Sequence, residues 1–342
     1  MSTTARSQAS SESLRLFAIL ALLVAGTFAL SVIVGSAAVR PWALWRALAD
    51  GDRPLLARVF WELRVPRAAL GLMVGACLGL AGAAMQGLMH NPLVEPGVGG
   101  VSGGAALGAV VAIYSGLVDL SGLAPQVAGV AGALLAVLLI EVVAGRGVTS
   151  EGVLLAGFVV TTGCNALIAL VLNLSPNPLA SHEIIFWLLG SLADRSADHV
   201  RSAAPPMILG ALLLFSCGGS LRAWTLGEEA AASLGVRPRL LRLRLMLGSA
   251  LAVGAAVSVS GTVGFVGLFV PHVLRPRVHG DPARLLWASA LGGALALSWA
   301  DLLARLSGRV LNGGELKLGV VTALLGTPPL LLVALRARRE LV

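Results

Sequence analysis

Charged side chains are scarce in this sequence. Asp, Glu, Lys and Arg together make up 12% of its 342 residues, about half of the roughly 25% found in soluble domains. Hydrophobic residues rise to 57%, where roughly 45–50% is usual. A globule of this length cannot bury that many, because much of a folded chain's surface stays in water. The composition excludes a soluble enzyme, a nucleic-acid-binding domain and a disordered chain, and it predicts a membrane protein.

Lysine is almost absent. The chain has 25 basic residues and Lys317 is its only lysine. A phosphate-cradling loop ends in Gly-Lys-Ser/Thr, but Lys317 is flanked by Leu316 and Leu318, so this chain does not hydrolyse ATP by that route. The arginines are spread over short loops rather than gathered in one stripe, which favours lipid headgroups and partner proteins over nucleic acid.

Residues that carry chemistry are also few. The three cysteines are an odd number, each in an apolar run, which predicts small buried hydrophobes rather than a disulfide or metal framework. The five histidines are scattered, so we expect no metal site and no cofactor bound by this chain. Few carboxylates lie in the apolar runs, which disfavours an ion-coupled carrier. Asp301 lies four residues before Arg305, a helical spacing that lets the two neutralise each other.

Long apolar runs are plentiful. A spanning helix needs about 20 apolar residues, and ten runs approach that length: 14–38, 66–89, 97–117, 124–144, 152–174, 203–221, 243–261, 263–279, 284–306 and 318–335. We therefore expect an all-α polytopic membrane protein with about ten transmembrane helices. It would form one transmembrane domain over 14–342, after a cytoplasmic tail at 1–13. Loop arginines favour cytoplasmic termini by a small margin.

Two further patterns concern packing. Segment 175–199 has an apolar core too short to span a bilayer, which predicts a short re-entrant or interfacial helix on the outer side. Glycines recur at every fourth position, and such ladders let helices approach closely. They either pack one subunit tightly or line a moving path; the two ladders are Gly71, Gly75, Gly79 and Gly100, Gly104, Gly108.

A polar stretch at 225–244 separates two apolar runs. Glu228 and Glu229 open a short helix-forming segment, where carboxylates suit the helix dipole, and Gly235 closes it. Three alanines in between give the helix a flat face. Such a helix suits another protein's cleft, although a solvated cytoplasmic loop has the same pattern.

Four stretches, at 62–108, 226–236, 261–286 and 300–332, carry a family resemblance in the right order over most of the chain. The chain resembles the permease subunits of binding-protein-dependent ATP-binding-cassette (ABC) importers for iron chelates, haem and vitamin B12. The resemblance implies the type II importer fold of vitamin B12 permeases and a homodimer with the path on its two-fold axis. It also implies two ATPase subunits that bind ATP and Mg²⁺, a periplasmic substrate-binding protein, and a bacterial inner membrane.

The resemblance implies three sets of site residues and no catalytic residue. Segment 226–236 matches the coupling helix, with Leu226, Gly227, Glu228, Glu229, Leu234 and Gly235 as its residues. The periplasmic arginines that pair with glutamates of the binding protein match Arg64, Arg67 and Arg305. For Arg64 and Arg67 the alternative is interfacial anchoring, and for Arg305 it is the internal pair with Asp301. The cytoplasmic gate matches Asn91, Leu93, Thr149 and Ser150, although Asn91-Pro92 is also a common turn start.

The sequence departs from the family's pattern at five positions. Glu151 and Gly152 stand where relatives have a hydroxyl and an arginine, Lys317 replaces a proline, and Pro329 and Leu330 follow Pro328 in place of two phenylalanines. These departures affect details of the gate and of the last helix. The resemblance leaves the cargo open between ferric siderophore, haem and corrinoid, with an iron chelate first.

Overall fold

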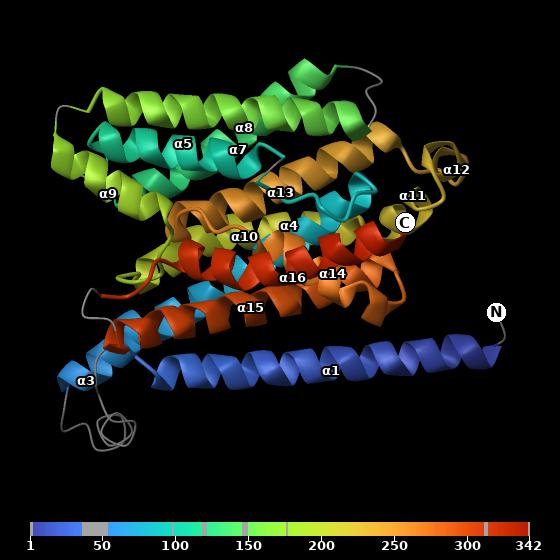
Figure 1. The fold of residues 1–342 in the computed structure, drawn as a ribbon, viewed down its shortest axis with the longest axis horizontal. Coiled ribbons are helices and arrows are strands. Elements are labelled where there is room, and N and C mark those ends of the chain that lie inside the picture. Colours follow the sequence, from blue (N-terminus) through green and yellow to red (C-terminus); the bar gives the residue numbers. More distant parts are fainter. Residues whose placement is uncertain are drawn as a thin grey trace.

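The computed structural model describes residues 3–35, 54–97, 99–117, 122–145, 150–175, 177–310 and 314–340. These residues form helices joined by turns and short connections, which confirms the all-α prediction (Figure 1). The helices are α1 (Thr3–Ile33), α3 (Pro54–Val59), η1 (Phe60–Arg64), α4 (Val65–Leu88), α5 (Val101–Tyr114), α7 (Ala124–Ala144), α8 (Ser150–Asn173), α9 (Pro178–Leu188), α10 (Ala197–Ser216), α11 (Gly218–Trp224), α12 (Glu228–Ser233), α13 (Pro238–Ser260), α14 (Val266–Leu274), η2 (Pro276–Val278), α15 (Pro282–Val310) and α16 (Leu318–Glu340).

Each of the ten predicted apolar runs contains a helix, but their lengths differ. Six described helices are long and apolar enough to cross a membrane, and α10 with α11, bent by 42°, makes a seventh. The apolar helices Val101–Tyr114 and Leu318–Leu331 are shorter. The run expected at 263–279 forms α14, whose nine residues extend about 14 Å and cannot cross a bilayer. Phe265, with φ 69°, precedes the first residue of α14, and Pro276, which lacks a backbone N–H, lies two residues after the last one.

The helices lie roughly along the long axis of the molecule (Figure 1). Helix α4 packs against α15, α5 against α7, and α13 against both α7 and α10. The start of α1 lies at the same end as α12, whereas α3 and α9 lie at the opposite end; we call these the α12 end and the α9 end. Helix α1 begins at Thr3, so most of the expected tail at 1–13 is helical.

The glycine ladders bring helix backbones into contact. A Cβ atom at Gly75 would lie 2.3 Å from the Gly293 carbonyl oxygen, and one at Gly79 would lie 2.1 Å from the Ser289 carbonyl oxygen, both on α15. A Cβ at Gly104 would lie 2.5 Å from the Gly132 carbonyl oxygen on α7. The ladders therefore serve tight packing within one chain.

Replacing Gly79 by Ala is expected to destabilise the protein by about 1–3 kcal/mol, because the new methyl group overpacks a backbone contact. Gly163 on α8 is the matched control, since its Cβ would meet nothing within 4 Å. Thermal unfolding in detergent compares the two. Equal shifts for Gly79→Ala and Gly163→Ala would contradict the packing role.

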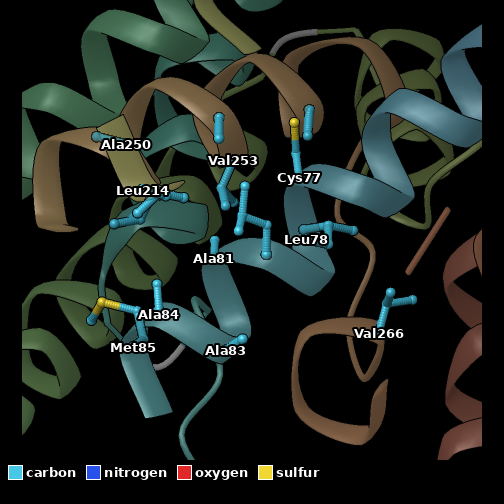
Figure 2. Close-up of a cluster of buried hydrophobic side chains, with 14 of the residues drawn as sticks. Cys77, Leu78, Ala81, Ala83, Ala84, Met85, Leu214, Ala250, Val253 and Val266 are labelled. Carbon is cyan, nitrogen blue, oxygen red and sulfur yellow. The ribbon is translucent and has the colours of Figure 1, made fainter. Parts of the chain in front are cut away.

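Small side chains fill the core between α4, α10, α13 and α14. Ala81, Ala84 and Ala250 are fully buried there and Val253 packs beside them (Figure 2). All three cysteines are buried and free, as predicted. Cys77 belongs to this cluster (Figure 2).

The predicted short helix at 175–199 is α9, capped by the Asn177 side chain, whose oxygen accepts a hydrogen bond from the Leu179 amide at 3.0 Å. Its far end is fastened to two other helices. The Ser191 amide donates to the Ser260 carbonyl oxygen at 2.8 Å, and the Leu318 amide donates to the Gly190 carbonyl oxygen at 2.8 Å. The end of α9 therefore joins the end of α13 to the start of α16.

Candidate functional site

The coupling segment, defined as residues 226–236, is a short helix held between two glycines. Helix α12 has six residues. Gly227 has φ 98° and Gly235 has φ 85°, values that glycine adopts without steric cost. Ala231 is buried against the rest of the protein. The sequence thus specifies a rigid, sharply bounded turn of helix, and the predicted short helix is confirmed.

The outer face of the coupling segment combines charge with two exposed leucines. Leu226 is 65% exposed and Leu234 is 64% exposed. Glu228 and Glu229 lie in the first turn between them, where negative charge is favourable, and both are exposed. Large apolar side chains displayed among charged ones are typical of a protein-docking surface.

Trp224, the last residue of α11, is buried close to the start of the coupling segment. It was not identified from the sequence. The side chain is 5% exposed, and its Nε1–H donates to the Leu88 carbonyl oxygen at 2.9 Å. The His90 Nε2 lies 3.0 Å from the Trp224 carbonyl oxygen, and because a carbonyl only accepts, the ring nitrogen donates. A tryptophan at a helix end is also typical of interfacial anchoring, so the sequence alone does not identify this contact.

The first half of the predicted gate is the turn after α4, which contains Asn91 and Leu93. The Leu93 amide donates to Asn91 Oδ1 at 2.9 Å, and the Val94 amide donates to the Asn91 carbonyl oxygen at 3.3 Å. Asn91 therefore builds an Asx turn, as the turn alternative predicted. Leu93 is 57% exposed. A gating role for this turn stays a prediction.

The second half of the predicted gate lies largely outside the described residues. Thr149 falls outside them, and Ser150 is described only as the first residue of α8. Among the family departures nearby, Glu151 is exposed and Gly152 is half-buried in the same helix turn.

The loop that follows the gate turn holds the short helix α14. Glu95 Oε1 accepts a hydrogen bond from the Phe265 amide at 2.9 Å, just before α14 begins. Arg275, which follows the last residue of α14, donates from Nη2 to Gln86 Oε1 at 2.9 Å. Both ends of α14 are therefore bonded to α4 or to its following loop.

The loop before α15 is fastened to α11 by an ion pair. Arg222 Nε donates to both Asp281 carboxylate oxygens at 3.0 Å, and the Ala283 and Arg284 amides also donate to Asp281 Oδ1. Burial raises the pKa of the Asp281 carboxyl, but the hydrogen bonds from Arg222 and the backbone outweigh it and hold this pKa below its usual value. Asp281 is therefore ionised at neutral pH and couples α11 to the start of α15.

The three predicted docking arginines lie together at the α9 end, and two of them hold the end of α1. Arg305 Nη1 donates to the Ser31 carbonyl oxygen at 2.7 Å and to the Val34 carbonyl oxygen at 2.9 Å. Arg64 Nη1 donates to the Ile33 carbonyl oxygen at 2.7 Å. The last carbonyls of a helix carry partial negative charge and interact favourably with cations. Arg305 is 1% exposed and Arg64 is 5% exposed.

The third arginine, Arg67, joins two carboxylates. Its Nη2 lies 2.8 Å from Asp301 Oδ1 and 2.7 Å from Glu315 Oε2. Arg305 pairs with Asp301 as the four-residue spacing predicts. We call Arg67, Asp301, Arg305 and Glu315 the charge cluster; its two positive and two negative charges balance. Sequence reasoning missed Glu315, because no helical spacing connects it to its partner. Docking by the three arginines stays a prediction.

The described chain has the architecture of a polytopic helical membrane protein with an exposed short helix, α12, at one end. The profile of the FecCD transport family matches residues 21–336. The chain therefore belongs to the FecCD transport family, as the sequence motifs indicated, and is a permease subunit of ABC transport.

Relatives and a solved structure agree with this membership. The chain is 38% identical over 302 residues to the vitamin B12 import system permease protein BtuC of Vibrio cholerae, covering 87% of each chain. It is 38% identical over 293 residues to the uncharacterized ABC transporter permease protein YvrB of Bacillus subtilis, covering 84% of this chain and 82% of that one. An inward-facing structure assigned to the metal-chelate type of ABC transporter matches with a TM-score of 0.82 and 27% identity, covering 94% of this chain and 99% of the other.

Proposed function

We propose that this permease imports a metal chelate across a bacterial inner membrane as a homodimer, with both termini and the α12 end in the cytoplasm. Two separate ATPase subunits bind ATP and Mg²⁺ and dock on the coupling segments, and a periplasmic binding protein delivers the cargo at the α9 end. The observation that carries the proposal is the exposed six-residue helix α12 in a chain of this family. The leucines that flank this helix, Leu226 and Leu234, are exposed beside its two glutamates and suit a partner's cleft.

Transport follows from alternating access driven by the partners. ATP-driven closure of the ATPase subunits moves the two coupling segments, and the motion reaches the turn of Asn91 and Leu93 and the start of α8 at Ser150 (with Thr149 before it). These small polar and apolar side chains close the path without binding the cargo tightly. The cargo can then leave when the turn moves.

The three arginines have different roles in the proposed docking of the binding protein. Arg67 is the contact residue: its carboxylate partner Glu315 is partly exposed, at 22% of its side chain, and a carboxylate of the binding protein can compete for the same guanidinium. Arg64 and Arg305 hold the end of α1 behind it and preserve the shape of the surface. Charge pairs of this kind steer docking more than they add affinity.

The cargo is proposed as a metal chelate of one of two kinds. An iron chelate, either a ferric siderophore or haem, is the expectation from the sequence motifs. The names of the Vibrio cholerae relative and of a 34% identical Shigella boydii relative, both vitamin B12 import permeases, support a corrinoid instead. The solved metal-chelate transporter is compatible with both.

A panel of loaded binding proteins distinguishes these cargoes. The permease is reconstituted with its ATPase subunits in proteoliposomes, and ATP hydrolysis is measured with binding proteins carrying cobalamin, a ferric siderophore or haem. We expect one loaded protein to stimulate hydrolysis several-fold and its radiolabelled cargo to accumulate. Stimulation by none of the three, together with no accumulation, would contradict the proposed cargo class.

A further inference from the structure

Trp224 lies at the junction of three parts of the molecule. Its indole Nε1–H donates to the carbonyl oxygen of Leu88, the last residue of α4, at 2.9 Å. Its own carbonyl oxygen accepts two hydrogen bonds, from the Gly227 amide at 3.1 Å and from the His90 ring at 3.0 Å. Gly227 lies in the coupling segment just before α12, and His90 precedes the Asn91 turn. One residue therefore touches the coupling segment, the end of α4 and the gate turn.

The side chains around Trp224 are closely packed. Trp224 is 5% exposed, Leu88 2% and Leu221 1%. The His90 and Trp224 rings stack, with centroids 6.1 Å apart and planes inclined by 21°. His90 itself has φ 49°, in the left-handed region that few residues other than glycine adopt. The backbone of His90 is thus held in an unusual conformation that places its ring against Trp224.

We propose that Trp224 is a positioning residue for energy coupling, which makes the coupling segment, the end of α4 and the Asn91 turn move as one body. This inference rests on the proposed function. A displacement of Gly227 by an ATPase subunit pulls on the Trp224 carbonyl. The same carbonyl holds His90, and the indole holds Leu88. Without these bonds the coupling segment tilts while α4 stays in place, so ATP is hydrolysed without opening the path.

The test separates the hydrogen bonds of Trp224 from its bulk. Trp224→Phe keeps an aromatic ring in the buried site and removes the N–H that Leu88 accepts. His90→Asn keeps a residue that tolerates the left-handed conformation and removes the ring that reaches the Trp224 carbonyl. Each change breaks one arm of the junction.

Both variants are measured in the full complex of permease, ATPase and binding protein in proteoliposomes, with uptake and ATP hydrolysis followed in parallel. We expect the complex to assemble and to hydrolyse ATP, because the ATPase contacts 226–236 rather than Trp224. Uptake per ATP hydrolysed is expected to fall about tenfold in each variant, the scale of one lost hydrogen bond.

Trp287→Phe is the matched control. Trp287 lies on α15, is 56% exposed and stacks on Phe215 with centroids 3.9 Å apart; among the described residues none accepts a hydrogen bond from its indole. We expect its uptake per ATP to equal that of the wild type.

The outcomes separate this inference from the proposed function. A wild-type complex that shows no ATP-driven uptake contradicts the proposed function. A wild-type complex that transports, alongside Trp224→Phe and His90→Asn variants with unchanged uptake per ATP, overturns only the role of Trp224. If Trp224→Phe fails to assemble, His90→Asn decides, since it leaves the indole hydrogen bond intact.

Discussion

Replacing Leu226 and Leu234 together by Asp is expected to reduce ATP-driven uptake by about 100-fold or more. The two leucines are the large apolar side chains that the coupling segment exposes, at 65% and 64%. A central apolar contact of an interface is worth about 2 kcal/mol or more, and each 1.4 kcal/mol changes an equilibrium about tenfold. Two such losses, with carboxylates added beside Glu228 and Glu229, separate the ATPase from the permease.

The measurement is twofold. Capture of the ATPase subunit by tagged permease in detergent reports binding, and uptake into proteoliposomes reports transport. Leu179→Asp is the control, because Leu179 is 75% exposed on α9 at the opposite end. It should leave ATPase capture unchanged. Normal capture and uptake by the double variant would show that the ATPase docks elsewhere.

Replacing Asp301 by Asn is expected to destabilise the permease by about 3–5 kcal/mol, the cost of leaving a buried charge without its partner. Asp301 accepts hydrogen bonds from both Arg67 and Arg305, and the Arg305 side chain is 2% exposed. With an amide in its place, Glu315 alone faces two guanidiniums. Because Arg305 also holds the carbonyls at the end of α1, we expect α1 to loosen from the bundle.

Thermal unfolding in detergent measures this loss, and proteolysis near the end of α1 locates it. Asp198→Asn is the control, since Asp198 pairs with Arg201 at 3.1 Å on the surface with its side chain 77% exposed, and exposed pairs contribute roughly 0–1 kcal/mol. Equal changes in melting temperature for the two variants would mean that the charge cluster does not stabilise the fold.

The sequence predicted what repeats along the chain. Apolar runs located the long helices, and the four-residue glycine spacing predicted close approach of helices, which α4 and α15 show. The paired glutamates and closing glycine predicted α12. Each of these features depends on neighbours within a few residues, so its signal is local.

The sequence did not predict contacts between residues that are far apart along the chain. Arg67 and Glu315 are 248 residues apart, and Trp224 and Leu88 are 136 apart. No periodicity connects such pairs, because only the packed helices bring them together. The arginines at 64 and 305 had matched a docking pattern, yet their hydrogen bonds to α1 depend on where α1 ends. The bounds of α14 likewise depend on the positive φ of Phe265 before it and on Pro276 after it, within an apolar run that otherwise suits a span.

Reconstitution of the permease with and without its partners tests the central claim most directly. The account predicts no accumulation of cargo by the permease alone under an imposed proton or sodium gradient. It predicts accumulation when the ATPase subunits, ATP and the loaded binding protein are all present, insensitive to an uncoupler. Concentrative uptake by the permease alone, driven by an ion gradient, would contradict it.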